Sequence, residues 1–163
     1  MNEENPMTDT SSIESVLQSF YEVISGFASE KRDWDRMRSL FVPGASLMPS
    51  SIVCGTAAPS ALDIEAYVQR LDRFLSQQDF FETGFVHHIE RYGNIASVIS
   101  TYEARHTPTE SEPYRRGVNY IQMLSDGNRW WLTSMIWRDE TPDLAIPERY
   151  RRGRAAAYPQ AVG

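Results

Sequence analysis

The sequence predicts an α+β domain in which three N-terminal helices pack on a strongly curved antiparallel sheet, shaped like a cone. Apolar residues recur at helical spacing in the first half of the chain, and after residue 80 their period becomes that of strands. Helices followed by successive antiparallel strands are typical of the α+β class. The length of 163 residues, with 41% hydrophobic and 23% charged, fits one globular domain. We expect it to span residues 11–141, between a disordered leader (1–10) and an extended C-terminal tail (142–163).

Capping residues and apolar spacing locate the helices. Ser11 and Glu14 fit a capping box, so the first helix is expected to begin there. Its buried face is predicted to carry Ile13, Val16, Leu17, Phe20, Ile24 and Phe27. A short second helix over residues 33–41 turns four residues inward: Trp34, Met37, Leu40 and Phe41. The third helix is expected over residues 63–78, with Asp63 as its N-cap.

Strands are predicted from residue 45 onward. Residues 45–55 are expected to form a strand or a bent pair of strands, which Pro49 interrupts. Four further strands alternate in polarity and cover residues 85–92, 94–106, 115–125 and 129–137. The dipeptides Gly93–Asn94 and Asp126–Gly127 are typical of the tight turns of hairpins.

Three of the four tryptophans lie in the last predicted strand, within residues 130–137. Strict alternation puts one set on the face toward the helices: Trp131, Thr133, Met135 and Trp137. The opposite face then carries Trp130, Leu132, Ser134 and Ile136. Because both faces are largely apolar, we expect a second copy of the chain to cover the outer face, giving a homodimer. In the alternative, the C-terminal residues 141–150 fold back over part of that face.

Composition and charge indicate which kinds of partner the protein can bind and in which cellular compartment it is expected. A net charge of −6 argues against nucleic-acid binding, which favours basic surfaces. The N-terminus has no basic and apolar segments typical of a signal peptide, and no apolar run is long enough to cross a membrane. The single cysteine, Cys54, cannot form an intrachain disulfide, so we expect a cytoplasmic protein.

Three stretches resemble the nuclear transport factor 2-like superfamily, which includes SnoaL-like polyketide cyclases, ketosteroid isomerases and scytalone dehydratases. They are SLFVPGASL, RYGNIASVISTYEAR and GVNYIQMLSDGNRWWLTSMIW, and the last two are similar to an uncharacterised bacterial branch. The resemblance covers residues 12–140 and implies a pocket between the helices and the concave face of the sheet. None of the three stretches is a catalytic signature.

The resemblance also suggests site residues. Tyr21 corresponds to the tyrosine that ketosteroid isomerases carry on the first helix, and Asn119 to their second acid. The position of their aspartate base falls near Pro49, which cannot accept a proton, so ketosteroid isomerase activity is not expected. Dehydratases of the superfamily use tyrosine, histidine and asparagine side chains, a set that Tyr21, Tyr102, Asn119 and a histidine of the His87–His88 pair can imitate.

The chemistry of these side chains supports two interpretations. His87 is expected to point inward, where a neutral imidazole can act as a general base, or else it is a core or interface histidine with one hydrogen bond. Tyr21 and Tyr102 can hold an oxyanion, or they are core residues whose hydroxyls reach the rim. Asn119 on an apolar face needs either a buried partner or a ligand. The cavity wall is expected to contain Trp131, Met135, Trp137 and Met48.

The predicted function is binding of a small apolar or aromatic molecule. As an enzyme, the chain is expected to catalyse isomerisation, dehydration or cyclisation without a cofactor. We expect no metal, because the three histidines lack zinc-site spacing, and no nucleotide cofactor, because there is no glycine-rich phosphate loop. The alternative is a non-catalytic binding or assembly module whose polar groups are satisfied internally.

Overall fold

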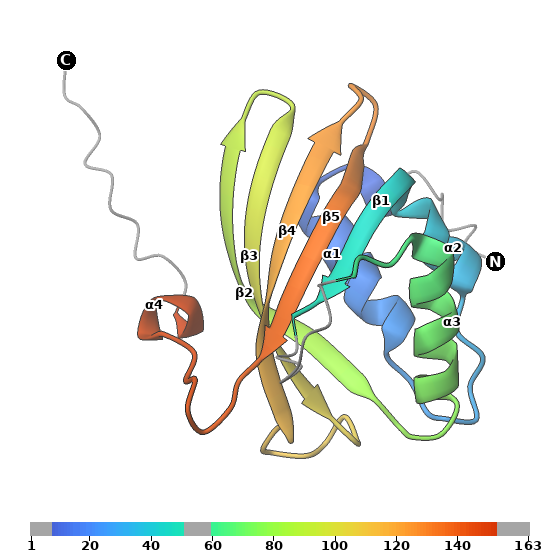
Figure 1. The fold of residues 1–163 in the computed structure, drawn as a ribbon, viewed down its shortest axis with the longest axis vertical. Coiled ribbons are helices and arrows are strands. Elements are labelled where there is room, and N and C mark those ends of the chain that lie inside the picture. The colour runs from blue at the N-terminus through green and yellow to red at the C-terminus, as the bar shows by residue number, and fades with distance from the viewer. Residues whose placement is uncertain (1–7, 51–59, 153–163) are drawn as a thin grey trace.

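The computed structural model describes residues 8–50 and 60–152, and its elements follow the predicted order. Three helices lie on one face of the sheet (Figure 1): α1 (Ile13–Ile24), α2 (Trp34–Ser39) and α3 (Ile64–Leu75). The five strands are β1 (Phe41–Pro49), β2 (Phe81–Tyr92), β3 (Ile95–Arg105), β4 (Arg115–Ser125) and β5 (Trp130–Asp139). A 3-10 turn, η1 (Thr8–Thr10), precedes α1, and a single turn, α4 (Glu148–Arg151), lies across the sheet from the other helices (Figure 1). No helix in the described ranges is long and apolar enough to span a bilayer.

The sheet is mixed and open, with strand order β1-β5-β4-β3-β2. Strands β2 to β5 form an antiparallel meander, but β1 pairs with β5 in parallel, so the expectation of a wholly antiparallel sheet is wrong for β1. The parallel pairing is possible because 80 residues, including α3 and three strands, separate β1 from β5 and no tight turn has to join them. We call the face toward α1, α2 and α3 the inner face and the opposite one the outer face.

The helix caps differ from the sequence prediction by one residue at α1. The N-cap is Ser12, whose Oγ accepts a hydrogen bond from the Ser15 backbone N–H at 3.0 Å, while Ser15 Oγ accepts one from the Ser12 N–H at 3.0 Å. A serine at the third helical position therefore replaces the predicted Glu14 in the capping box. At α3 the predicted N-cap is confirmed, since the Asp63 carboxylate accepts the Ala66 N–H at 2.8 Å.

Two predicted boundaries also shift. Residues 8–10, expected in the disordered leader, form η1, and the Asp9 carboxylate lies 2.8 Å from Arg36 Nε in α2. Phe41, expected as the last inward residue of the second helix, is instead the first residue of β1 and pairs with Leu132. Residues 51–59, which include Cys54, lie outside the described part.

A bulge in β5 reverses the predicted orientation of two tryptophans. Gln122 pairs with Ser134 and Met123 with Leu132, so Thr133 is an extra residue in β5. One extra residue shifts the side-chain alternation by one. Trp130 is consequently 5% exposed and belongs to the core with Leu132, Met135 and the partly buried Trp137. Trp131 and Ile136 lie on the outer face, so the predicted placement of Trp130, Trp131 and Leu132 is wrong.

The C-terminal segment covers part of the outer face, as the second alternative predicted. Thr101 Oγ1 donates a hydrogen bond to the Tyr150 carbonyl at 2.6 Å, and the hydroxyls of Tyr120 and Tyr150 lie 2.9 Å apart. This contact places α4 over β2 and β3 (Figure 1). Tyr120 remains 48% exposed despite its contact with Tyr150, and Ile136 is 47% exposed.

Candidate functional site

A cavity of about 540 Å³ lies between the inner face of the sheet and helices α1 and α3. Its apolar wall is formed by Phe20, Ile24, Pro49, Tyr67, Leu71, Phe74, Phe80, Met135 and Trp137. Its polar and ionisable lining consists of Arg70, Glu82, Tyr102, Arg115, Asn119, Arg138, Asp139 and Thr141. Both the volume and the mainly aromatic wall are typical of sites for small organic molecules.

Small residues near one end of the inner face, where β2 and β4 begin and β3 ends, provide room beside the large ones. The strand register aligns Glu82, Ala104 and Arg115 in one row across three strands, with alanine between the two charged side chains. In the next row, Tyr102 lies between Gly84 and Gly117. A Cβ atom at Gly117 would overlap the Tyr102 ring, and one at Gly84 would overlap Tyr21 and His87. The two glycines therefore allow these rings to lie flat against the sheet.

Glu82 is an ionisable residue of the cavity whose carboxyl group is not held by other side chains of the described residues. Its backbone is fixed by Ser25 at the end of α1, whose Oγ accepts the Glu82 N–H at 3.0 Å. Among the described residues, its carboxyl group has no hydrogen-bond partner and faces the cavity. The pKa of Glu82 is raised to about 8, mainly because the carboxyl group is buried; Arg115 opposes this shift and Asp139 adds to it. The site therefore contains a carboxyl group that is mainly protonated at neutral pH.

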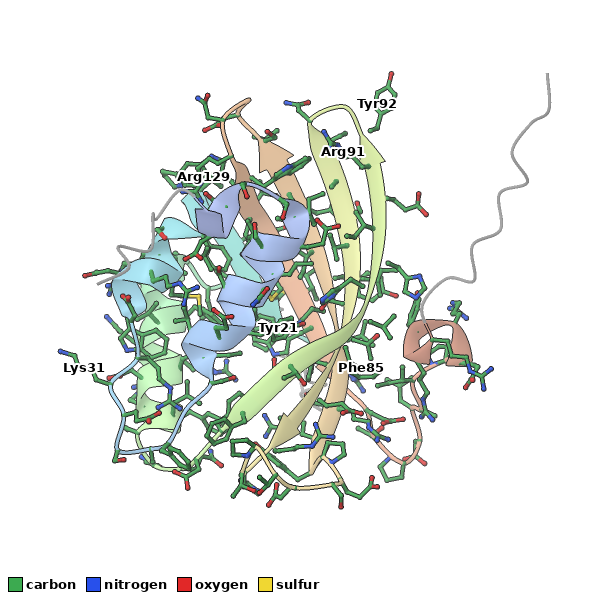
Figure 2. The ribbon with its side chains drawn as sticks, turned by 180° about the vertical axis from the view of Figure 1, so that it is seen from behind. Tyr21, Lys31, Phe85, Arg91, Tyr92 and Arg129 are labelled. Atoms are coloured by element: carbon green, nitrogen blue, oxygen red, sulfur yellow. The ribbon has the colours of Figure 1, made fainter. Side chains whose placement is uncertain are left out.

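Two of the predicted site residues bind each other. Asn119 Nδ2 donates a hydrogen bond to the Tyr21 hydroxyl at 2.9 Å, and that hydroxyl shares a 2.5 Å hydrogen bond with Ser100. Tyr21 lies between α1 and the sheet (Figure 2), and burial, followed by the nearby Glu82, raises its pKa. Of the two alternatives for Asn119, the structure gives it a buried partner. Its amide still lines the cavity beside that contact.

The Tyr102 hydroxyl contacts the Asp139 carboxylate at the cavity wall. Its hydroxyl donates a hydrogen bond to Asp139 Oδ1 at 2.6 Å. Burial is the main reason that the pKa of Tyr102 is raised, and the hydrogen bond to Asp139 adds to the shift. Because the Tyr102 proton is held by Asp139, Tyr102 is a weaker donor to a ligand than Tyr67. The Tyr67 hydroxyl has no hydrogen bond to any other described residue, and Tyr67 itself lines the cavity.

His87 lies on the inner face, as predicted, but lines a neighbouring groove of about 850 Å³ instead of the cavity. Its ring stacks on Tyr21 with centroids 6.3 Å apart, and Nδ1 is buried with no hydrogen-bond partner in the described residues. Burial lowers the pKa of His87, so it is neutral at physiological pH. Glu82 lines both hollows, whereas Tyr102 and Asn119 line the cavity and His87 lines the groove. His88 points to the outer face, near Tyr150.

Two of the four predicted wall residues line the cavity. Met135 and Trp137 do, and the Trp137 ring contacts Tyr67 edge-on with centroids 5.7 Å apart. Trp131 and Met48 do not. The bulge at Thr133 turns Trp131 outward, where its ring packs 3.5 Å from the Arg129 guanidinium. Met48 pairs with Ile136 and shares its outer face, whereas Leu47 points into the core.

Glu82 was missed by the sequence prediction because the predicted strand began at residue 85, whereas β2 begins at Phe81 and contains a second bulge. Gly84 pairs with Tyr102 and Val86 with Thr101, which leaves Phe85 as the extra residue where β2 bends (Figure 2). Without the bulge, Glu82 and His87 would lie on opposite faces. The available signal was Gly84, because a glycine inside a strand pattern often marks a bulge.

Within residues 8–50 and 60–152, no three His, Cys, Asp or Glu side chains are arranged to hold a metal ion. No family model and no curated protein matches the sequence.

Solved structures with this fold exist. An NTF-2 like protein of unknown function from Silicibacter pomeroyi is 12% identical, with a TM-score of 0.55 over 78% of this chain and 92% of that one. A Nostoc punctiforme protein of unknown function with a cystatin-like fold is 12% identical, with a TM-score of 0.59 over 82% and 96%. The hexachlorocyclohexane dehydrochlorinase LinA-type3 from Novosphingobium barchaimii is 12% identical, with a TM-score of 0.57 over 79% and 84%. The chain therefore has the nuclear transport factor 2-like, or cystatin-like, fold that its sequence resembles.

Proposed function

We propose that the chain binds a small, largely aromatic organic molecule in the cavity and that Glu82 exchanges a proton with it without a cofactor. The observation that supports this most is a carboxyl group with no partner among the described residues, facing a wall of aromatic rings. Structural groups of this kind are normally hydrogen-bonded. One structure with the same fold is named a hexachlorocyclohexane dehydrochlorinase, which also favours a small organic ligand here.

The surroundings of Glu82 suit proton transfer near neutral pH. A pKa of about 8 means that both the acid and the carboxylate are populated between pH 7 and pH 9, and a catalytic acid or base works best under this condition. The Tyr67 hydroxyl and the Asn119 amide line the same cavity and can stabilise an oxyanion. Glu82 takes the role of base in this proposal instead of His87, because His87 lines the neighbouring groove.

A test uses 5-nitrobenzisoxazole, an aromatic probe that opens when a base removes one proton. The carboxylate of Glu82 would take the ring C–H proton, the released electron pair would form a nitrile, and the N–O bond would break to leave a coloured phenolate. We expect saturable ring opening whose rate rises with pH through the Glu82 pKa of about 8. Glu82→Gln is expected to lower the rate by about two orders of magnitude, the usual contribution of a positioned general base.

The matched control is Glu112→Gln, because the Glu112 side chain is 86% exposed and does not line the cavity. This variant should keep the wild-type rate. Saturable binding with no rate difference between wild type and Glu82→Gln would refute the catalytic part of the proposal. That result would favour a non-catalytic binding module, which the internal Tyr21–Ser100–Asn119 network already suits.

We also propose that two chains associate through the uncovered part of the outer face. Met48, Ile136 and Tyr120 are neighbours in one row across β1, β5 and β4, and Ile136 and Tyr120 are each about half exposed in the single chain. Contiguous apolar surface of this kind is typical of subunit contacts.

Light scattering tests the association. We expect a dimer for the wild type and a monomer for Ile136→Glu, because a charge in the centre of an apolar contact has to be desolvated. Tyr92→Glu, at the tip of the β2–β3 hairpin (Figure 2), should leave the dimer intact. A monomeric wild-type chain at micromolar concentration would contradict the proposal.

A further inference from the structure

Three arginine side chains line the cavity without a bonded carboxylate. Arg70 comes from α3, Arg115 from β4 and Arg138 from β5. Arg115 Nε lies 3.8 Å from Asp139 Oδ2, beyond hydrogen-bond distance, and Arg138 uses one N–H to bind the Ser50 carbonyl at 3.1 Å. Arg70 forms no hydrogen bond or ion pair with another described residue. Each guanidinium therefore has free N–H donors at the cavity.

Several arginines outside the cavity are paired with carboxylates of the protein. Six of them have a guanidinium nitrogen within 3.0 Å of a carboxylate oxygen: Arg36, Arg38, Arg105, Arg116, Arg151 and Arg152. A guanidinium has five N–H donors in a planar fork that matches a carboxylate. Arg70, Arg115 and Arg138 have no such short carboxylate contact in the described residues, so their guanidinium groups can bind a carboxylate that enters the cavity.

The charge of the cavity also opposes that of the whole chain. The chain carries a net charge of −6, but the cavity lining has three arginines against Asp139 and Glu82. Burial holds the pKa of Glu82 at about 8, so this residue adds little negative charge at neutral pH. A positively charged, partly enclosed site in an acidic protein favours an anionic ligand.

The positions of these groups indicate the size of that ligand. Arg70 is three residues after Tyr67 and four before Phe74, so all three share one face of α3, and Arg115 lies 5.7 Å from the Phe74 ring. Ala104 lies between Glu82 and Arg115 in the sheet, so their Cα atoms are roughly 10 Å apart, two strand spacings. A ligand that reaches both Arg115 and Glu82 can therefore be small, on the scale of one aromatic ring with a carboxylate.

We propose that the ligand is a small aromatic carboxylate, whose carboxylate binds Arg70 and Arg115 while its ring lies among Tyr67, Phe74 and Trp137. This inference rests on the proposed function, because it assigns a chemical class to the molecule that Glu82 acts on. Arg138 contributes positive charge at the same opening.

Calorimetric titration with benzoate and with benzamide, its neutral analogue, tests the inference. We expect the wild type to bind benzoate about tenfold more tightly than benzamide, the scale of a charge-assisted contact. Arg70→Met and Arg115→Met should each remove most of that preference and leave benzamide binding unchanged. Arg73→Met is the control, because Arg73 is also exposed on α3 but does not line the cavity. Benzoate affinity should also fall as Glu82 ionises, and Glu82→Gln should abolish that fall.

The outcomes separate the two proposals. Equal affinity for benzoate and benzamide, or arginine variants that bind benzoate like the wild type, would overturn the carboxylate inference alone. Turnover of 5-nitrobenzisoxazole without binding of either titrant would do the same and leave the proton-transfer proposal standing. If no probe binds or reacts, both proposals fall. Because Arg70 is exposed on a helix surface, Arg70→Met keeps the test valid even if Arg115→Met does not fold.

Discussion

Replacing Trp130 with alanine is expected to cost about 3–5 kcal/mol of the free energy of unfolding, the range for removing a large aromatic side chain from a core. Trp130 is 5% exposed, packs in the main core and lies 4.9 Å from the Arg91 guanidinium. The cavity left by its indole cannot be filled by neighbouring strands without shifting the sheet. Urea denaturation of wild type and variant measures the difference, provided that the dependence on urea is the same for both.

The adjacent Trp131 provides a matched control of the same residue type. It lies on the outer face, where it packs on Arg129 and donates a hydrogen bond from Nε1 to Asp126 at 2.9 Å. Because both contacts are near solvent, Trp131→Ala should cost about 1 kcal/mol. A larger loss for Trp131 than for Trp130 would mean that β5 keeps strict alternation and has no bulge at Thr133.

This pair of residues shows where sequence patterns predict a sheet and where they fail. The predicted inward positions of Tyr102 in β3 and Asn119 in β4 are correct, because alternation in those strands is unbroken. In β5 and β2 one extra residue, Thr133 or Phe85, reverses the alternation partway along the strand. Periodicity alone does not locate such a residue, because strands on either side of a bulge are each regular.

The sequence also predicted the candidate site in part, as it did the faces of the strands. Tyr102 and Asn119 lie on the inner face and line the cavity, as expected, whereas Tyr21 of α1 contacts Asn119 but lines the neighbouring groove. Their partners were not predictable, because the Tyr21–Asn119 contact joins residues 98 positions apart and depends on how α1 crosses the sheet. Glu82 was not predicted, because it precedes the predicted strand 85–92 and a glutamate at such a position is usually exposed to solvent.

The small residues contain information about the cavity that a search for catalytic types overlooks. Ala104 in β3 and Gly117 in β4 lie on the inner face. Gly84 in β2 pairs with Tyr102 in β3. Large apolar side chains at these positions would fill the space and bury the Glu82 carboxyl completely. A run of small inner residues next to one ionisable residue is therefore a more direct sign of a site than the histidine pair.

The second large effect expected is on the pH dependence of stability, through Glu82. An unfolded glutamate titrates near pH 4.5, but the folded pKa is about 8, so the folded state holds its proton more tightly. Below about pH 4 both states are protonated, and Glu82 has no effect on stability. As pH rises from about 5 to 8, the unfolded state ionises first, and stability is lost progressively until Glu82 ionises in the folded state as well.

Glu82→Gln removes this titration and should therefore stabilise the protein at high pH. We expect no difference from wild type near pH 4 and an advantage of about 1–3 kcal/mol near pH 9, after allowance for solvent at the cavity. Because His87 is present in both proteins, the effect of its lowered pKa cancels in the comparison. Urea denaturation at the two pH values measures the difference, with Glu112→Gln as the exposed control. A Glu82→Gln advantage that is constant with pH would show that the Glu82 carboxyl titrates normally, and the proton-transfer proposal would then lose its physical basis.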